Sequence, residues 1–582
     1  MSERKVSRFR VLTAGLLLEL CGGSIYIVSL YLHQVQVIWF PNDDNSLEKV
    51  ESLAFACNLG NWIPIAGFFY DWRYGGPRNT VLAASLLTLV GYGGLWLCSV
   101  HVPEGGYSSA GRLWLLRILW FMWGHGSGYF DCACIATTAH NFAKERGTAM
   151  GVVKALYGLS GSLLTQPYKC FFSSDAPAFL AFLGIGLSSL GTVVAPFVRV
   201  VDFTPAMMAA DSPLLRLRVA FILIFTLALI MAAAGVLRSL NLVSTGLSYG
   251  ILSVAIGGVI ALLGVSYGSS VSTAHRVSLM EDQDNSTAAE KVVDGSGPST
   301  ASDDPGAAAA PSTTTPINAA TEPMVQTVTF AEPERSPPPR PLALQRQDSL
   351  TNAPVTETLL TANFWLIFVA FFAGTGGGLT ITNHIEFIVL AQFGPSRHTD
   401  AKRTSDALIS LFSVFNCLGR LGAGMGSDIF RRYINRPTVF ALATALMGIA
   451  HGLLLGAQSV FLLYAAIVCA GVSYGAFWSL VPSLVGELFG LAAFASTYMA
   501  YSLATSSASL ILSTTIASRV AEAHTPPSPP PPPGAPPPPP PDCYGDECYR
   551  LTHLIIIGCC AVGALCVGVV SVRTRHFYRA RL

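Results

Sequence analysis

The chain has 582 residues, of which 51% are hydrophobic and only 12% are charged, and its formal net charge is +1. This balance argues against a nucleic-acid partner, because phosphate binding needs a clustered basic face. The many apolar stretches of roughly 20 residues are long enough to span a bilayer and predict an integral membrane protein in contact with lipid. No Cys or His spacing indicates a zinc site, and no ATP-binding motif is visible, so we expect no metal and no cofactor.

Fourteen apolar runs predict membrane-spanning helices. In chain order they cover residues 11–33, 53–70, 80–100, 113–140, 148–170, 178–198, 219–237, 247–268, 364–390, 408–427, 438–457, 461–487, 492–518 and 552–572. Gly, Ala and Ser are frequent within them, which favours helices that pack closely through small faces. We therefore expect an all-α bundle with an amino-terminal six-helix half (1–200), two additional helices (201–268) and a carboxyl-terminal six-helix half (362–582).

Two segments are expected to lie outside the membrane. Residues 269–361 are rich in Ser, Thr, Ala and Pro, with too few large apolar residues for a core, and predict a disordered cytosolic linker. An exofacial loop at 519–551 contains "TPPSPPPPPGAPPPPPP" (525–541), which predicts a stiff polyproline II spacer. Next to it, Cys543 and Cys548 could form a disulfide in an oxidising lumen or remain a free pair.

The orientation follows from Lys and Arg in short loops, which favour the cytosolic side. Clusters at 4–10, 73–78, 144–146, 431–436 and 573–581 all fall on one side of the expected bundle. An even number of helices then places both termini in the cytosol. A basic loop at 397–403 goes against this rule. No retention or lipidation signal chooses between the plasma membrane and an endomembrane.

A short motif occurs twice, in "GFFYDWRYGGPR" (67–78) and "GMGSDIFRR" (424–432). Each copy has the spacing G-x-x-x-D at the cytosolic end of the second helix of a half. One copy alone would be an ordinary loop with a turn glycine, but two matching copies predict a latch between related halves that rock about a midplane site. We expect the cytosolic gate to contain Gly67, Asp71, Arg73, Arg78, Arg146, Arg420, Gly424, Asp428, Arg431, Arg432 and Glu487. Glu487 is expected to pair with Arg420, Arg431 or Arg432.

The order of Gly, Asp and Arg in this motif resembles the inter-helix signature of the major facilitator superfamily, although the first copy has one inserted residue that offsets Arg73 and Arg78. The chain is similar in more detail to the nodulin-like subfamily. The matching stretches are "RGTAMGVVKALYGLSGSLLTQPY" (146–168), "NFWLIFVAFFAGTGGGLTITN" (363–383), "NCLGRLGAG" (416–424), "VGELFGLAAFASTYMAYSLATSSASL" (485–510) and "CYGDECYRLT" before the last helix. The resemblance implies a membrane transporter with a nodulin-like amino-terminal half and a facilitator carboxyl-terminal half, but no particular cargo.

Four ionisable residues are expected at membrane depth, where charge is costly and often functional: Glu19, Asp131, Lys154 and, nearer the exofacial rim, Glu386. Counting along the helices places Asp131 and Lys154 at the same depth, roughly 12 to 14 Å from the cytosolic surface, so they could pair. Lys154 also matches a Lys of the nodulin-like pattern, which implies an anion-binding or charge-balancing role. Glu19 and Asp131 fall where relatives have uncharged residues, and a desolvated carboxylate could carry a coupled proton. The alternative is a structural salt bridge between Asp131 and Lys154.

Other polar and aromatic residues at interior depth are candidates for the lining of a substrate cavity. They are Tyr26, Asn58, Asn61, His125, Tyr157, Gln166, Asn383, His384 and Trp478. Each of them alone is more often a packing residue or a helix-to-helix hydrogen bond than a substrate contact.

The leading hypothesis is a secondary active transporter that moves a small polar or anionic solute by alternating access, with or without coupled protons. A monocarboxylate is the first choice, because Lys154 supplies a buried cation, and cationic or neutral solutes stay open. A second hypothesis is a non-transporting receptor or scaffold that recruits partners through the linker and the Pro-rich loop. An enzyme is not expected, because no nucleophile, metal or paired-carboxylate motif stands out. We expect a monomer.

Overall fold

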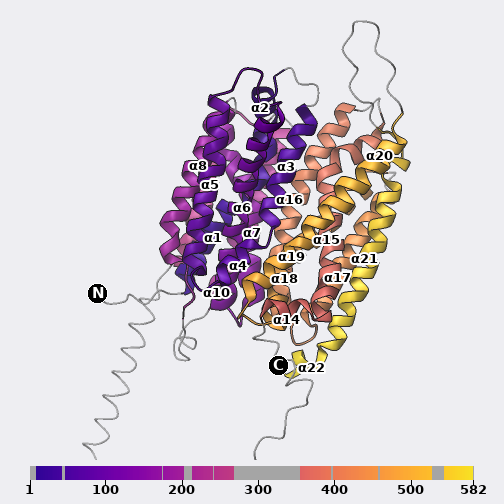
Figure 1. Ribbon diagram of the computed structural model, residues 1–582. Coiled ribbons are helices and arrows are strands. Elements are labelled where there is room, and N and C mark those ends of the chain that lie inside the picture. Colours follow the sequence, from indigo (N-terminus) through magenta and orange to yellow (C-terminus); the bar gives the residue numbers. More distant parts are fainter. Residues whose placement is uncertain are drawn as a thin grey trace, which may run out of the picture. The chain divides into compact units, whose positions relative to one another are not determined.

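The computed structural model describes residues 8–41, 46–172, 175–201, 213–239, 242–267, 354–394, 398–456, 459–526 and 543–580. All of them belong to one compact unit, made of residues 1–268 and 346–582. The described residues form helices and connecting turns, with no strand among them, and Figure 1 shows the helices running side by side. The all-α fold expected from the sequence is therefore confirmed.

The amino-terminal half contains six long helical segments, coloured indigo to purple in Figure 1. They are α1 (Arg8–Gly22) with α2 (Val28–Trp39), α3 (Ser46–Trp62) with α4 (Ile65–Asp71), α5 (Gly76–Val100), α6 (Ala110–Asn141), α7 (Arg146–Pro167) and α8 (Ala176–Val194). The first segment changes to a 3₁₀ turn at Gly23, where the backbone approaches Ser160 too closely for any side chain. The second is interrupted at Pro64, since Pro has no N–H to continue the helix.

The carboxyl-terminal half repeats this arrangement with six further segments. They are α15 (Ala362–Phe393), α16 (His398–Ile429), α17 (Arg436–Leu455), α18 (Val460–Leu488), α19 (Phe494–Ala508) with α20 (Ser518–His524), and α21 (Glu547–Arg573). A π-helical stretch, Ser509–Ala517, joins α19 to α20. Corresponding helices pack together in both halves, since α3 packs on α6 as α16 packs on α18, and α5 packs on α8 as α17 packs on α21. The two halves therefore share one packing scheme, as in transporters built from internal repeats.

Two additional helices, α10 (Pro213–Ser239) and α11 (Thr245–Tyr267), follow the amino-terminal half. Helix α10 packs against α7 of the first half and α16 of the second, while α11 packs against α1, α7 and α10. The halves also meet directly, because α7 packs on α16 and α4 packs on α19. In each of these two pairs, the fifth helix of one half contacts the second helix of the other.

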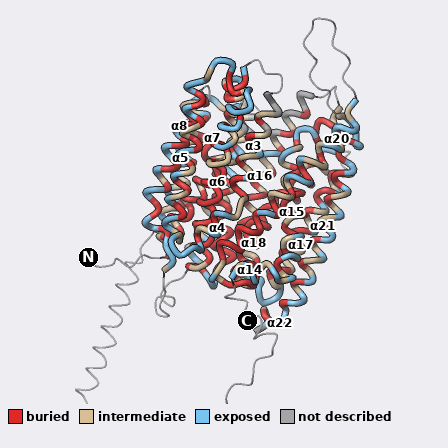
Figure 2. The backbone as a smooth tube through the Cα atoms, viewed as in Figure 1, coloured by how far each residue is buried: buried red, intermediate tan, exposed pale blue. Residues whose placement is uncertain are grey.

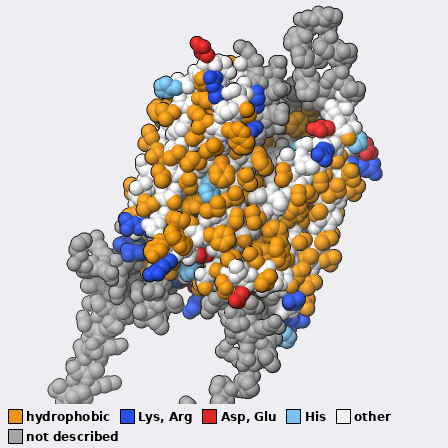
Figure 3. Space-filling view, viewed as in Figure 1, with side chains coloured by type: hydrophobic (Ala, Val, Ile, Leu, Met, Phe, Trp, Pro, Cys, Tyr) orange, Lys and Arg blue, Asp and Glu red, His pale blue; other side chains and the backbone are white. Residues whose placement is uncertain are grey.

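All fourteen expected apolar runs coincide with helical segments, and eleven helices of the described residues are long and apolar enough to cross a membrane. The remaining three segments, α6, α7 and α19, carry more polar groups, but most of their residues are buried against other helices (Figure 2). Polar residues at membrane depth usually face the bundle interior in this way. Apolar side chains cover the middle of the surface seen in Figure 3, as lipid contact requires.

We call the end of the bundle that carries Arg73, Arg78, Arg431 and Arg432 the basic end, and the opposite end, where Cys543 lies, the loop end. Two short helices, α14 (Val355–Leu359) and α22 (Arg575–Ala580), lie at the basic end (Figure 1). The expected linker, 269–361, lies outside the described residues up to 353, and its last part is helical rather than irregular.

The exofacial loop expected at 519–551 is shorter at both ends, because its first residues complete α20 and its last residues begin α21. Most of the polyproline stretch lies outside the described residues. Beyond it, Cys543 and Cys548 are joined by a disulfide. The amide of Gly545, inside this small ring, donates a hydrogen bond to the Ala391 carbonyl at the end of α15, N to O 2.9 Å, which fixes the ring to the bundle.

Candidate functional site

A cavity of about 970 Å³ lies between the two halves. Its wall is built by α2, α3, α6, α7 and α10 on one side and by α15, α16, α18 and α19 on the other. The charged side chains in the wall are Asp131, Lys154, Arg238 and Arg420, which are three cations and one carboxylate. The cavity wall therefore carries an excess of positive charge.

Lys154 and Asp131 form a buried ion pair in the cavity wall, between α7 and α6. Lys154 is 1% exposed, and its ammonium group lies over the rings of Tyr157, Trp478 and Tyr498. The Tyr498 hydroxyl, from α19 of the other half, donates to the second oxygen of Asp131 at 2.9 Å. The positive charge of Lys154 is thus neutralised by Asp131, and the pair also connects the two halves.

Arg420 is a cation of the cavity wall that forms no ion pair with a described carboxylate. It is 1% exposed, its Nη1 donates to the Lys154 carbonyl at 2.6 Å, and its Nε donates to Oδ1 of Asn416 at 3.0 Å. Its Nη2 has no hydrogen-bond partner. The groups around the guanidinium are the phenols of Tyr26, Tyr157 and Tyr474, and no carboxylate of the described residues lies within ion-pair distance. We had expected Arg420 in the gate, but it lies two helical turns deeper than Asp428 and faces the cavity.

Glu19 lies beside this cluster on α1 and does not line the cavity. It is fully buried, and neither of its carboxyl oxygens has a hydrogen-bond partner among the described residues. The charged groups that act on it are Asp131, Lys154 and Arg420. An unpaired carboxylate is expensive to bury, so this position is a costly one for a charged group.

Of the other expected lining residues, Tyr26, Asn58, Asn61, Tyr157, Gln166, Asn383 and Trp478 lie in the cavity wall. The two histidines do not. His125 Nδ1 lies 2.8 Å from the Gly60 carbonyl and joins α6 to α3, whereas His384 Nε2 lies 3.1 Å from the Ser513 carbonyl. Both rings are therefore used in packing between helices. Sequence reasoning missed Asn416, Tyr474 and Arg238 as lining residues; the first could have been found by its i, i+4 spacing to Arg420.

At the basic end, Asp71 closes one contact between the halves. Its Oδ2 accepts hydrogen bonds from the Ser496 amide at 2.7 Å and the Ser496 hydroxyl at 2.6 Å, in the first turn of α19. Amides of a first helical turn have no partner within their helix, and the helix dipole favours an anion there. Gly67, one turn before Asp71, allows α4 to approach the Ala495 carbonyl so closely that no side chain would fit.

Asp428 makes the matching contact on the other side of the bundle. Its Oδ2 accepts from the Thr148 amide at 2.6 Å and the Thr148 hydroxyl at 2.8 Å, in the first turn of α7. Gly424, one turn earlier, lies against Gly147 with no space for a side chain on either residue. The two copies of the sequence motif thus form two equivalent helix caps, each between opposite halves.

The arginines around these caps differ from the expected set. Arg436, the first residue of α17, pairs with both Asp428 and Glu487, at 3.0 Å to the latter, and the Tyr578 hydroxyl donates to Glu487 at 2.7 Å. The expected partners of Glu487 (Arg420, Arg431 and Arg432) were therefore wrong. Arg431, Arg432, Arg73 and Arg78 are exposed and form no ion pair with a described carboxylate, whereas Arg146 is buried against Gly486.

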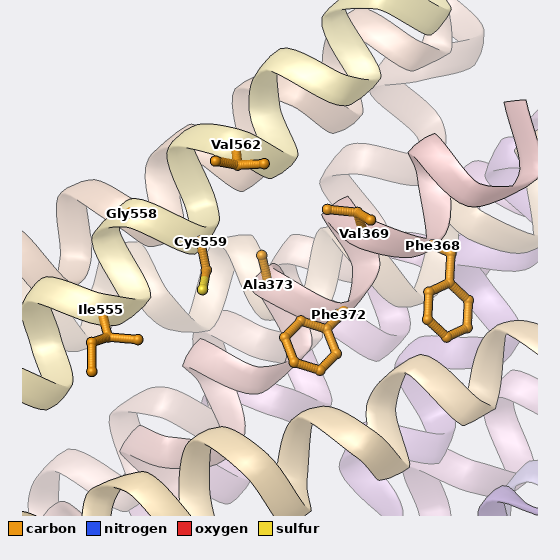
Figure 4. Close-up of a pocket in the computed structure, with 8 residues that line it drawn as sticks. All are labelled: Phe368, Val369, Phe372, Ala373, Ile555, Gly558, Cys559 and Val562. Atoms are coloured by element: carbon orange, nitrogen blue, oxygen red, sulfur yellow. The ribbon is translucent and has the colours of Figure 1, made fainter. Parts of the chain in front are cut away.

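A second cavity, of about 500 Å³, lies between α15 and α21 (Figure 4). Its wall contains only apolar side chains and glycine: Phe368, Val369, Phe372, Ala373, Ile555, Gly558, Cys559 and Val562. Without a polar group to orient a solute, it is a poor candidate for a transport site. We therefore place the candidate site in the central cavity.

Comparison with known proteins agrees with this architecture. A family model described as nodulin-like matches residues 8–265, and one described as Major Facilitator Superfamily matches residues 316–513. The uncharacterized MFS-type transporter YhjX of Escherichia coli is 28% identical over 144 residues, which cover 25% of this chain and 34% of that protein. The probable transporter mch1 of Neurospora crassa is 28% identical over 210 residues, which cover 32% of this chain and 34% of that protein.

The matched region thus spans about a third of the length of these two relatives. Among solved structures, the proton:xylose symporter XylE bound to 6-bromo-6-deoxy-D-glucose aligns over 96% of this chain and 94% of that chain, with a TM-score of 0.50 and 13% identity. At this identity the likeness concerns the fold alone.

Proposed function

Because the chain belongs to the nodulin-like family of the major facilitator superfamily, we propose that it is a secondary active transporter that moves a small anionic solute across a membrane by alternating access. A monocarboxylate is the solute that fits best. The relatives named as transporters and the cavity between two repeated halves support transport in general.

The observation that carries the choice of an anion is Arg420. Its guanidinium is buried in the cavity wall, has no carboxylate partner and keeps one nitrogen without a hydrogen bond. Burying a cation is costly unless an anion compensates it, and a carboxylate is well matched to a guanidinium. The tyrosines around Arg420 offer apolar ring surface to the small organic part of such a solute. Lys154 is less suited to hold the solute, since Asp131 already neutralises it.

The two helix caps at the basic end supply the gate of this mechanism. Positive residues favour the cytosol, so the basic end is assigned to the cytosolic side and the described state is closed toward the cytosol. Opening toward the cytosol would separate α4 from α19 and α7 from α16, which breaks both caps. Arg436 and Glu487 strengthen the cap at Asp428 within the carboxyl-terminal half.

Glu19 is the proposed carrier of a coupled proton. It is buried beside the Asp131–Lys154 pair, and Arg420 donates to the Lys154 carbonyl. The charge of Glu19 is therefore close enough to act electrostatically on the proposed anion site. Replacing Glu19 by Gln mimics the protonated form. We expect this variant to exchange labelled solute across the membrane but to lose uptake driven by an inward proton gradient, measured in proteoliposomes. Retained gradient-driven uptake would rule out Glu19 as the carrier.

The anion assignment is tested by uptake of labelled monocarboxylates, neutral solutes and cationic solutes into proteoliposomes, comparing wild type with Arg420→Gln and Arg420→Lys. Loss of a charge-assisted hydrogen bond of about 1.5–3 kcal/mol should lower kcat/KM roughly 10- to 150-fold in Arg420→Gln. Arg420→Lys should retain part of the activity, because it keeps the charge but not the forked geometry. Arg432→Gln, at an exposed arginine near the same helix, serves as the matched control and should behave as wild type.

Folding of each variant is checked by size-exclusion chromatography before uptake is measured. Uptake of a neutral or cationic solute, unchanged in Arg420→Gln, would contradict the anion assignment. The alternative of a non-transporting scaffold rests on segments outside the described residues, and it would be favoured only if folded wild-type protein moved no solute.

A further inference from the structure

Helix α10 lies outside both six-helix halves, yet one of its faces forms part of the central cavity. The cavity wall includes Ala228, Met231, Ala232, Gly235 and Arg238 of this helix. Successive members of this set are one or three residues apart, which places all five residues on one face of the helix. An additional helix therefore contributes directly to the surface that a solute meets.

The packing of α10 explains how it reaches the cavity. It contacts α7 and α16, the two helices through which the halves meet, and so covers the line between them. At Gly235 the approach to α16 is close, since a Cβ atom there would lie 3.2 Å from the Ser410 hydroxyl. The next turn of α10 carries Arg238, which points its guanidinium toward α7.

Arg238 makes a defined contact across the cavity wall. Its Nη2 donates to Oε1 of Gln166 on α7 at 2.7 Å, and the Gln166 amide nitrogen is held in turn by the Ser162 carbonyl at 2.7 Å. Gln166 is 3% exposed, so its orientation is fixed by protein groups. No described carboxylate forms an ion pair with Arg238, and a single neutral acceptor leaves most of its five N–H donors available.

The position of this contact along the cavity distinguishes it from the site at Arg420. Gln166 follows Lys154 by twelve residues on α7, which corresponds to roughly 18 Å of helix rise toward the loop end. Arg420 is bonded to the Lys154 carbonyl and therefore lies at the level of Lys154, closer to the basic end. The two cations of the cavity wall that form no ion pair with a described carboxylate are thus bonded to α7 at points roughly 18 Å apart along that helix.

We propose that Arg238, positioned by Gln166, forms an outer anion-binding subsite in which a small carboxylate is captured before it reaches Arg420. The assignment of a carboxylate rests on the proposed function, whereas the attraction of anions to this part of the cavity rests only on the charges around Arg238. An unpaired cation in a partly enclosed wall raises the local concentration of anions and their rate of arrival. The additional helix would then take part in substrate selection as well as in packing.

Two measurements test this subsite. The first is the initial rate of carboxylate uptake as a function of concentration for wild type, Arg238→Gln and Arg238→Lys. We expect KM to rise about three- to tenfold in Arg238→Gln, with kcat within about twofold of wild type and with a weaker dependence on ionic strength. The KM of Arg238→Lys should lie between the KM values of wild type and Arg238→Gln. Arg218→Gln, at an exposed arginine of the same helix that does not line the cavity, should match wild type.

The second measurement does not require transport. Thr165, beside Gln166 in the cavity wall, is replaced by Cys, and its modification by anionic and cationic methanethiosulfonates is followed by mass spectrometry of the peptide. The ratio of anionic to cationic reaction rates should fall at least about threefold when Arg238→Gln is added. An unchanged ratio would overturn the subsite, whether or not the protein transports.

The combined outcomes separate the two proposals. If the reagent ratio falls but no carboxylate is taken up by wild type, the proposed substrate is wrong and the anion-attracting subsite stands. If carboxylate is taken up but neither KM nor the reagent ratio responds to Arg238→Gln, the proposed function stands and the subsite is wrong.

Discussion

Replacing Lys154 by Gln is expected to destabilise the protein by about 3–5 kcal/mol, because Asp131 would be left as an unpaired charge in the interior. Asp131→Asn should be similarly destabilising, since it leaves the Lys154 ammonium among aromatic rings without a counter-ion. The double variant replaces both charges together and should be considerably more stable than the sum of the two losses predicts. Thermal unfolding in detergent, followed for all four proteins, gives this comparison.

This cycle also decides between the two roles considered for Lys154. If Lys154 only balances Asp131 and ties α6 to α7, the double variant should regain folding and most of its uptake. A well-folded double variant without uptake would show that Lys154 has a direct role in transport. Additive losses in stability would contradict the ion pair itself.

The second large effect is expected from removing both latch carboxylates. In Asp71→Asn with Asp428→Asn, the uncharged amides can no longer offer an anion to the first turns of α19 and α7. Each anion at a helix N-terminus contributes about 0.3–1 kcal/mol, and up to about 2 kcal/mol when partly buried. Asp428 is the more buried and also pairs with Arg436, so we expect the larger share from it. Together the changes should shift the balance toward opening at the basic end by about 2–3 kcal/mol, or roughly 30- to 150-fold.

Accessibility of a reporter cysteine measures this shift. Ser427 is 1% exposed and lies against Gly147 in the closed contact between α16 and α7, so Ser427→Cys should react slowly with a maleimide. The reaction should become at least about tenfold faster in the double Asn background. Asp546→Asn, at an exposed carboxylate of the loop end, is the control. Equal reaction rates in all backgrounds would show that the caps do not hold this end closed.

Much of the fold could be predicted because membrane helices are marked by length and hydropathy. The breaks within helices were harder to see, since the 3₁₀ turn at Gly23 depends on the approach of Ser160 from another helix. The repeated G-x-x-x-D motif indicated where the halves meet. Its partners, the amides of Ser496 and Thr148, could not be identified from the sequence. Every residue except proline has a backbone N–H, so the sequence does not show which of them donates to the Asp.

Individual side chains in the site were predicted less well, for physical reasons. Asp131 and Lys154 could be matched by counting residues from the same short loop. Arg420, Gly424 and Asp428 are spaced four residues apart and lie on one face of α16, which suggested a common role in the gate. Arg420 is nevertheless separated from Asp428 by roughly 12 Å of helix rise and so lies in the cavity wall. Arg238 was not considered, since nothing in its sequence context shows that α10 packs against α7 and α16.

Alternating-access transport of a small anion can be measured by counterflow in proteoliposomes loaded with unlabelled monocarboxylate. Wild-type protein should accumulate external labelled solute transiently above its equilibrium level, because each return of the carrier exchanges one bound solute for another. Arg420→Gln should show little or none of this overshoot, and Arg432→Gln should show all of it. Folded wild-type protein that gives no overshoot with any monocarboxylate tested would contradict anion transport by this protein.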